Sequence, residues 1–292
     1  WFIACGAGCR VGAGLMKTMQ GHFKGVDGGS VFFQTWQPDT AARAIVFLAH
    51  GAAEHSGRYV HVAQYFVERG YMVAALDHIG HGMSDGTPGF IESFDHYIQN
   101  LEILRSQVHA EHPHLPCILL GHSMGGLIAA NALLDFQEKY IACVLSGPAI
   151  QSDVAPPAWQ IFIIRLLSRW WPRLGVLQLD ASLVSRDPLV VDAYRQDRLV
   201  YSGKLSARQL VEMFSAMQRA QDHAHEITIP LLVLHGSADQ LTAPSGSQFL
   251  YDHVGSTEKL LKIYPGLFHE IFNEPEHNEV LQDVLQWCDA RL

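Results

Sequence analysis

Cys117-Ile118-Leu119-Leu120-Gly121-His122-Ser123-Met124-Gly125-Gly126 is the stretch that decides the fold of this chain. An apolar run typical of a buried strand ends here in the pattern G-x-S-x-G. A run of small and apolar residues typical of a helix follows from Leu127 to Leu134. A serine between two glycines at a strand-to-helix turn is the signature of a nucleophile elbow, which exposes the serine oxygen and excludes large neighbours. We therefore interpret Ser123 as a nucleophile; the alternative is a plain glycine-rich turn.

A serine hydroxyl needs a base that takes its proton and a third group that orients the base. On a fold built around such an elbow, the acid and then the histidine follow the serine along the chain. Asp239 lies in the loop after a strand-like run at 229–236, and His269 lies in the loop after another at 258–264. Both are expected at the sheet edge that carries Ser123. We assign Ser123 as nucleophile, Asp239 as orienting acid and His269 as general base.

Other residues compete for these roles, because the chain has 17 histidines. His122 adjoins the nucleophile, but its side chain is expected to point away from the serine oxygen. His235 lies within a strand-like run and is expected to pack in the core. Asp77 also ends a strand-like run and is the strongest rival acid, yet it precedes Ser123 and breaks the expected order.

The oxyanion formed during acyl transfer needs N–H donors aimed at it. The backbone N–H of Met124, the residue after the nucleophile, is the first donor expected. Residues 44–49 are an earlier strand-like run, and His50-Gly51-Ala52-Ala53-Glu54-His55 follows as its loop. Small residues there let the main chain approach a substrate, so the N–H of Ala52 is the second donor predicted. The alternative is an ordinary strand-to-helix turn.

Strand-like and helix-like stretches alternate along the chain, which predicts an α/β fold with a mostly parallel central sheet. Residues 22–26 and 31–36 flank Gly28-Gly29 as an opening hairpin. Further strands are expected at 44–49, 72–76, 117–121, 141–145, 230–235 and 259–264, and helices at 57–69, 93–111, 125–137, 244–254 and 277–291. Residues 16–146 and 227–292 form the predicted core. The segment 147–226 is too long for one crossover and is predicted to be a cap inserted over the catalytic edge.

The composition restricts the possible classes of protein. With 292 residues, 48% of them hydrophobic, the chain can bury one large core. The formal net charge of −9 argues against nucleic acid as a partner. The five cysteines show no metal-ligand spacing and imply no disulfide framework, so we expect no metal and a reducing, cytoplasmic location. Cys117 and Cys143 are expected to be small buried thiols.

Residues 1–15 differ from the rest of the chain, being rich in glycine, alanine and cysteine with one arginine after the apolar stretch. We interpret them as a non-native or disordered leader, with the natural start at Met16 or Met19. The alternative is a weak signal peptide or anchor, although a secretory signal carries its positive charges first. No run approaches the ~20 apolar residues that a membrane span requires.

These motifs together resemble the monoacylglycerol lipases of the serine α/β-hydrolase family. The matching stretches are residues 50–59, 77–86, 121–126, 236–239 and 260–269, and the likeness covers roughly residues 20–290. The resemblance implies an α/β-hydrolase fold with a cap. It also implies hydrolysis of the ester of 1- or 2-monoacylglycerols to a free fatty acid and glycerol, without cofactor or metal.

The resemblance also implies where the glycerol head of the substrate lies, near Glu54, Arg58, His122 and Tyr194. The alternative for the first two is an internal ion pair at i, i+4 that holds the loop. Mammalian members carry a cysteine shortly after the catalytic aspartate, where this chain has Thr242. Inhibition by thiol reagents is therefore not expected there.

Residues 158–176 carry the information about the acyl chain. Arg165, Arg169 and Arg173 recur every four residues, and Pro172 is expected to end or kink the helix. The remaining positions are mostly large and apolar: Trp159, Phe162, Ile163, Leu166, Leu167, Trp170 and Trp171. We expect this cap helix to line an acyl tunnel, to contact a lipid surface peripherally, or both. The alternative is a helix that only packs on the core.

Three other functions remain open at this stage. The first is a broader carboxylesterase or lysophospholipase, and the second is acyl transfer to an alcohol, which the same three residues permit. The third is a non-catalytic hydrolase-fold protein that binds a small lipophilic ligand, which the presence of all three residues disfavours. Fold alone decides none of these, and the sequence leaves the oligomeric state open.

Overall fold

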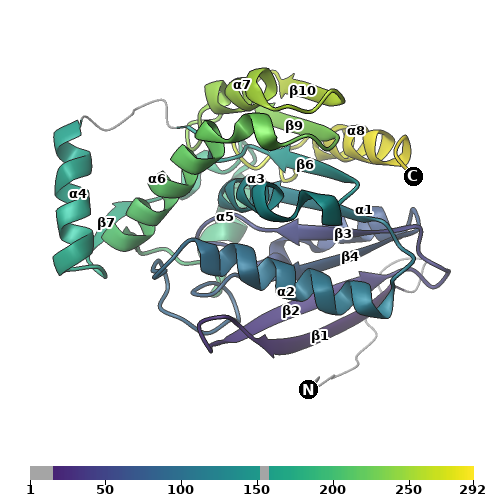
Figure 1. Cartoon of the computed structure of the whole chain (residues 1–292), viewed down its shortest axis with the longest axis horizontal. Coiled ribbons are helices and arrows are strands. Elements are labelled where there is room, and N and C mark those ends of the chain that lie inside the picture. The colour runs from purple at the N-terminus through teal and green to yellow at the C-terminus, as the bar shows by residue number, and fades with distance from the viewer. Residues whose placement is uncertain (1–15, 152–157) are drawn as a thin grey trace.

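Eight strands form one central sheet in the computed structural model, which describes residues 16–151 and 158–292 (Figure 1). The strands are β1 (Lys17–Lys24), β2 (Ser30–Gln37), β3 (Ala44–Ala49), β4 (Tyr71–Leu76), β5 (Cys117–His122), β6 (Ala142–Ser146), β9 (Leu231–Gly236) and β10 (Lys259–Tyr264). Their order is β1-β2-β4-β3-β5-β6-β9-β10. The first two strands pair antiparallel, β2 is antiparallel to β4, and all later neighbours are parallel. The predicted α/β-hydrolase fold with a mostly parallel sheet is confirmed.

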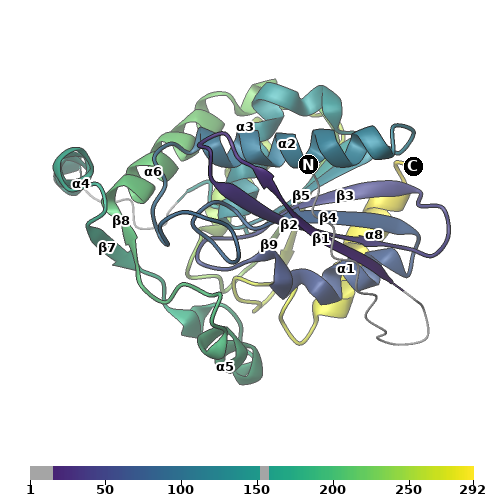
Figure 2. The same ribbon diagram turned by 90° about the horizontal axis from the view of Figure 1, so that it is seen from below.

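Helices cover both faces of this sheet, which explains why its central strands are apolar along their whole length. The helices are α1 (Val60–Val67), α2 (Asp95–Glu111), α3 (Met124–Phe136), α7 (Pro244–His253) and α8 (His277–Asp289). Helices α2, α3 and α7 contribute to the core on one face, whereas α1 and α8 contribute to the core on the other. Figure 2 shows α2 and α3 on one side of the sheet and α1 and α8 on the other. Neighbouring residues of β3 alternate between the two cores, as Phe47 and Leu48 do.

The segment between β6 and β9 carries its own elements over one end of the sheet. They are α4 (Ala158–Trp170), β7 (Gly175–Gln178), η3 (Ala181–Leu183), α5 (Pro188–Gln196), β8 (Lys204–Ser206), α6 (Ala207–Asp222) and η4 (Ala224–Glu226). Helix α6 packs on α3 of the core, where Arg219 pairs with Asp135 at 2.7 Å. Helix α4 packs on α6 and lies at the outer edge of the molecule (Figures 1 and 2). The cap boundaries at 147 and 226 stay a prediction, and α6 contacts both α4 and the core helix α3.

Two sequence predictions differ in extent from the structure, and one feature was not predicted. The opening hairpin is longer than predicted, pairing Lys17 with Gln37 and Lys24 with Ser30. The cap helix is shorter than the range 158–176, because α4 ends at Trp170 and β7 begins at Gly175. The expectation that Pro172 ends the helix is confirmed. Pro172 cannot supply the backbone N–H that a continuing helix needs. Strands β7 and β8 pair antiparallel in a small sheet that the sequence did not indicate.

The predictions about the cysteines and about a membrane span can be compared with the described residues. Cys117 and Cys143 are buried free thiols, as expected. No described helix is long and apolar enough to cross a membrane. The interpretation of residues 1–15 as a leader lies outside the described residues.

Candidate active site

Ser123 lies at the sharp turn between β5 and α3, with φ 56° and ψ −119°. Its backbone N–H donates to the carbonyl of Ser146 at 2.9 Å on the neighbouring strand. A Cβ atom on Gly121 would lie 2.3 Å from the carbonyl oxygen of Gly125, and one on Gly125 would lie 2.0 Å from the carbonyl oxygen of Ala49. Both glycines are therefore required by close backbone approach. The turn holds Ser123 in a left-handed conformation that costs energy for a residue with a side chain.

Asp239 and His269 are joined by a hydrogen bond across the ends of β9 and β10. The Nδ1–H of His269 donates to Oδ2 of Asp239 at 2.7 Å. The other oxygen, Oδ1, accepts the backbone N–H groups of Leu241 at 2.8 Å and Thr242 at 3.0 Å. The hydroxyl of Thr242 lies 2.9 Å from Oδ2. The carboxylate is thus fixed by the backbone on one side and bonded to the imidazole on the other.

This pairing shifts the pKa of both side chains. Burial acts to raise the pKa of Asp239, but the charge of His269 and hydrogen bonds from His235 and His269 hold it well below its usual range. Burial acts to lower the pKa of His269, yet the charge and hydrogen bond of Asp239 outweigh burial and raise it above 6.5. Asp239 is therefore ionised at neutral pH, and its charge makes the imidazole of His269 a stronger base.

Ser123 lies against the loop after β3, and His122, the residue before it, lies beside the ring of His269. A Cβ atom on Gly51 would lie 3.1 Å from the Cβ of Ser123, and the ring of His122 lies 4.7 Å from the ring of His269. Within the described residues, the Ser123 hydroxyl makes no hydrogen bond. Hydrogen bonds between a nucleophile and its base are often loose without substrate and tighten when substrate binds.

The loop after β3 is held rigidly against the elbow. Oε1 of Glu54 accepts the N–H of Gly51 and the hydroxyl of Tyr59, both at 2.6 Å. Ala53 has φ 65°, and its carbonyl accepts the N–H of Tyr201 of the cap at 2.8 Å. Ala52, between the clamped positions, lies in the loop that faces Ser123. Its predicted role as an oxyanion donor stays a prediction.

Met124, the other predicted donor, is the first residue of α3. Backbone N–H groups in the first turn of a helix have no acceptor within the helix. The helix dipole adds a partial positive charge at this end. The start of α3 can therefore stabilise an anion that forms next to Ser123.

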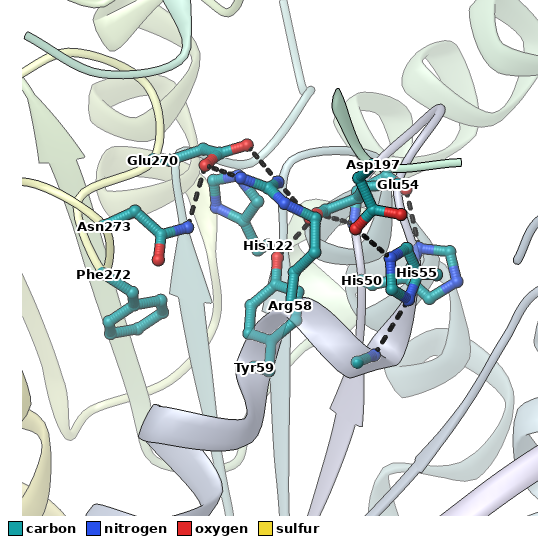
Figure 3. Close-up of polar contacts among 12 residues, drawn as sticks. His50, Glu54, His55, Arg58, Tyr59, His122, Asp197, Glu270, Phe272 and Asn273 are labelled. Carbon is teal, nitrogen blue, oxygen red and sulfur yellow. Dashed lines mark hydrogen bonds and ion pairs between the residues drawn. The ribbon is translucent and has the colours of Figure 1, made fainter. Parts of the chain in front are cut away.

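The residues expected around the glycerol head lie close together in the structure. Arg58 donates to Oε2 of Glu54 at 2.7 Å (Figure 3). Its guanidinium carbon lies 4.6 Å from the ring centre of Tyr194. His122 is buried nearby, with Nδ1 3.1 Å from the hydroxyl of Ser146. Glu54 is 2% exposed, and protein donors already bond its oxygens. The internal ion pair considered from the sequence is present, and the substrate contacts stay a prediction.

Glu270 completes this cluster and was missed from the sequence. It accepts two hydrogen bonds from Arg58, at 2.5 and 2.7 Å, and a third from Asn273 at 2.8 Å (Figure 3). Burial acts to raise the pKa of Glu270, but the charge of Arg58 outweighs it and keeps the carboxyl ionised. Burial, with the charge of His269, lowers the pKa of His122 to about 4. No spacing in the sequence links Arg58 to Glu270, since 212 positions separate them.

The rival acid Asp77 accepts hydrogen bonds from two loops next to the site. Its Oδ1 accepts the N–H and the hydroxyl of Ser56, at 2.8 and 2.6 Å, and its Oδ2 accepts the N–H of Met83 at 2.8 Å. The structure therefore brings Asp239, and not Asp77, to His269.

His235 was expected only to pack, and it is fully buried. Its Nε2 also lies 3.0 Å from Oδ2 of Asp239, a contact that the sequence analysis missed.

A cluster of three buried histidines lies beneath the loop after β3. The ring centres of His50 and His78 are 4.3 Å apart, and those of His50 and His81 are 5.4 Å apart. Burial lowers the pKa of His50 and of His81 to about 4, so both rings are neutral at neutral pH. Across residues 16–151 and 158–292, no group of three or more His, Cys, Asp or Glu side chains has the geometry to hold a metal ion.

A cleft of about 790 Å³ opens on the cap beside the Arg58 cluster. Tyr194, Asp197 and Tyr201 are among its lining residues. Asp197 also accepts a hydrogen bond from His55 at 2.9 Å, which ties this part of the cap to the loop after β3 (Figure 3). The volume is within the range of small-molecule sites.

Comparisons with known proteins identify the family to which the chain is similar. The family model Hydrolase_4, described as serine aminopeptidase, S33, matches residues 40–276. The chain is 43% identical over 270 residues to a monoacylglycerol lipase of Mycolicibacterium smegmatis, covering 92% of this chain and 96% of the relative. It is 31% identical to human monoglyceride lipase, covering 92% and 90%. The crystal structure of the Paleococcus ferrophilus monoacylglycerol lipase superposes with a TM-score of 0.81 at 31% identity, covering 90% and 99%.

Proposed function

Because the chain belongs to the Hydrolase_4 family (serine aminopeptidase, S33), we propose that it is a serine hydrolase that cleaves monoacylglycerols to a free fatty acid and glycerol. The relatives named above support this substrate class, since they match nearly the whole chain. The observation that carries the proposal is the 2.7 Å hydrogen bond between Asp239 and His269 at the sheet edge where Ser123 occupies the strained turn.

In this proposal Ser123 is the nucleophile, His269 the general base and Asp239 the group that orients the imidazole. The Ser123 oxygen attacks the ester carbonyl while Nε2 of His269 takes its proton. The resulting oxyanion accepts hydrogen bonds from the N–H groups of Ala52 and Met124. His269 then protonates the departing glycerol oxygen as the carbon–oxygen bond breaks, which leaves the fatty acid as an ester on Ser123.

Water completes the reaction by the same steps in reverse order. His269 takes a proton from water as its oxygen attacks the acyl-enzyme, and the tetrahedral intermediate again rests on the two N–H groups. Collapse releases the fatty acid, and the proton returns from His269 to the Ser123 oxygen. No cofactor or metal enters any step.

The polar end of the substrate is proposed to lie near Glu54, Arg58, His122 and Tyr194. Tyr194 also lines a cleft of about 790 Å³, whose walls come from the cap alone and include none of Glu54, Arg58 or His122. Hydroxyl groups of glycerol need donors and acceptors, and a site with buried polar groups rejects ligands that leave them unpaired. Because protein partners already occupy Glu54 and Arg58, we expect them to shape this end of the site more than to contact glycerol directly.

The cap is proposed to contact a lipid surface through α4. Large apolar side chains on α4 and just after it are exposed, among them Trp159 (61%), Phe162 (68%) and Trp170 (65%). Arg165 and Arg169 lie exposed on the same helix. An apolar helix face with flanking cations is typical of helices that lie in the headgroup region of a lipid layer. Such a contact would deliver monoacylglycerol from the surface in which it dissolves.

The proposal is tested by a hydrolysis profile of the purified protein against mono-, di- and triacylglycerols, lysophospholipid and short nitrophenyl esters. A preference for monoacylglycerols is expected, and Ser123→Ala is expected to lower turnover by on the order of 10⁶ while the protein stays folded. Activity on short esters without preference for monoacylglycerols would instead favour a broader carboxylesterase. Appreciable turnover by the Ser123→Ala protein would exclude Ser123 as the nucleophile.

A further inference from the structure

Two histidines contact the same oxygen of Asp239. His269 reaches Oδ2 from the side of Ser123, at 2.7 Å, and His235 lies 3.0 Å from the same oxygen. His235 belongs to β9 and is 0% exposed, whereas His269 lies in the loop after β10. His235 therefore approaches the carboxylate from the interior of the protein. The mechanism described above does not use it.

The surroundings of His235 determine which ring nitrogen carries its proton. Nε2 faces the carboxylate of Asp239 and, at 3.3 Å, the backbone carbonyl of Thr242. Both groups only accept hydrogen bonds. The Thr242 hydroxyl also lies 3.4 Å from Nε2, but it is closer to Oδ2 of Asp239 (2.9 Å) and to the carbonyl of Gly147 (3.0 Å), so we place its proton on one of those and a hydrogen on Nε2. Nδ1 lies 2.7 Å from the hydroxyl of Ser247, which can donate to it. We assign the Nε2–H tautomer from this network.

These contacts form a continuous chain of hydrogen bonds. With this tautomer the Ser247 hydroxyl donates to Nδ1 of His235, and Nε2–H of His235, 3.0 Å from Oδ2 of Asp239, donates to that oxygen. The same oxygen accepts the Nδ1–H of His269 and the hydroxyl of Thr242. Ser247 is fully buried, so water does not compete for this chain from its side. Hydrogen bonds to a carboxylate in a buried setting are stronger than neutral ones.

We propose that His235 is a positioning residue of the active site, which holds Asp239 from its buried side through an Nε2–H···Oδ2 hydrogen bond. The proposal rests on the proposed function, in which Asp239 orients His269. The bond keeps negative charge on Asp239 and restrains Oδ2, so that the His269 ring stays aimed at Ser123. A donor on this oxygen also opposes transfer of the His269 proton to Asp239.

The proposal is tested with two amide variants of similar size. The side-chain nitrogen of Gln reaches about as far as Nε2 of histidine, whereas that of Asn reaches about as far as Nδ1. His235→Gln therefore keeps a donor toward Asp239, and His235→Asn keeps a polar group toward Ser247 but loses that donor. We expect kcat on monoacylglycerol to fall about 10- to 100-fold in His235→Asn and to stay within about threefold in His235→Gln, with KM little changed in both.

A second readout separates positioning from loss of packing. Losing one donor concentrates charge on Oδ2, which favours the protonated form of His269, so the acid limb of kcat/KM is expected to move to higher pH in His235→Asn. His269 also faces His122, Glu54 and Glu270, which both variants leave in place. Cys143→Ala is the matched control, because Cys143 is fully buried on the neighbouring strand β6. It is expected to lower the melting temperature and leave the acid limb unmoved.

Labelling of Ser123 by a fluorophosphonate gives a measurement that does not depend on the natural substrate. The labelling rate is expected to fall in His235→Asn and to be retained in His235→Gln. If wild-type protein is labelled rapidly but does not cleave monoacylglycerols, the substrate proposal fails and the His235 comparison can still be made. Equal rates and equal acid limbs for the folded Asn and Gln variants would overturn the positioning role.

Discussion

Arg58 and Glu270 form a doubly hydrogen-bonded ion pair, with Nη1–Oε1 at 2.5 Å and Nη2–Oε2 at 2.7 Å, although 212 positions separate them in the chain. Arg58 follows the loop that faces Ser123, and Glu270 follows His269 directly. Arg58 also bonds Glu54, which clamps that loop. The pair therefore ties the loop proposed to bind the oxyanion to the loop that carries the proposed base.

Glu270→Gln is expected to lower the free energy of unfolding by roughly 3 kcal/mol, because it removes one partner of a buried ion pair. Urea unfolding at pH 7 measures the change. Glu276→Gln is the matched control, since Glu276 lies in the same loop and pairs with Arg186 at the surface. An exposed pair is worth about 0–1 kcal/mol. Equal losses of unfolding free energy in the two variants would show that the buried Arg58–Glu270 pair stabilises the protein no more than an exposed pair does.

The pH dependence of kcat/KM is expected to show an acid limb above pH 6.5. The pKa of His269 is raised above 6.5 by Asp239, which outweighs burial, and the base must be neutral to accept the Ser123 proton. Activity therefore falls as the pH falls through this raised value. Asp239→Asn is expected to lower kcat by on the order of 10⁴ and to move the limb to lower pH. A limb that stays in place in this variant would contradict the assignment of Asp239 as the partner.

Acid is expected to destabilise the fold through the buried histidine cluster. The folded pKa values of His50 and His81 are about 4, below the ordinary 6.5, so the unfolded chain binds more protons. Their contribution to stability is present above pH 6.5 and is lost as the pH falls toward 4. Each contributes up to roughly 3 kcal/mol over that interval. Guanidinium unfolding at pH 7, 5.5 and 4 measures the slope.

His81→Asn is the variant that tests this prediction. Asn keeps a donor near the position of Nδ1, which faces the carbonyl of Ile79 at 3.1 Å, and removes the titrating ring. The fall in stability between pH 7 and 4 is expected to be smaller in this variant than in the wild type. His253→Asn, at an exposed position at the end of α7, is expected to leave the slope unchanged. A slope unaffected by His81→Asn would assign acid denaturation to other groups.

Binding to lipid vesicles is expected to depend on α4. Trp159→Ser combined with Phe162→Ser is expected to weaken binding to phosphatidylcholine vesicles by on the order of 100-fold, because two large exposed apolar side chains are lost. Sedimentation with vesicles measures the bound fraction. Leu189→Ser is the matched control, since Leu189 is 76% exposed on α5, elsewhere on the cap. An equal loss in the control would mean that binding is not specific to α4.

The sequence predicted the central sheet well because its strands are buried on both faces. Runs such as 44–49 and 117–120 are apolar throughout, so they are recognisable as buried strands without information from the rest of the chain. The short strands β7 and β8 gave no such signal, since they are four and three residues long and partly exposed. These two strands pair only because the fold of the cap brings them together, and the local sequence pattern of each strand carries no information about that contact.

The order of Ser123, Asp239 and His269 along the chain predicted the pairing of Asp239 with His269, which the structure shows. Their catalytic roles stay a prediction. The supports of these residues were not predictable in the same way. The Arg58–Glu270 pair depends on contact between loops far apart in the sequence. His235 is only four positions from Asp239 in the sequence. The apolar pattern of a buried strand does not predict which polar atom the side chain of His235 contacts.

The uneven distribution of tryptophan gives the protein a built-in optical reporter. Of the six tryptophans in the chain, Trp36 and Trp287 are buried in the core, whereas Trp159, Trp170 and Trp171 are 61–65% exposed on or just after α4. Indole emission shifts to the blue when the ring leaves water, so the steady-state spectrum of unlabelled protein will follow α4 and the residues just after it. Docking of the cap on a lipid layer can thus be watched in real time, without a dye or an engineered cysteine.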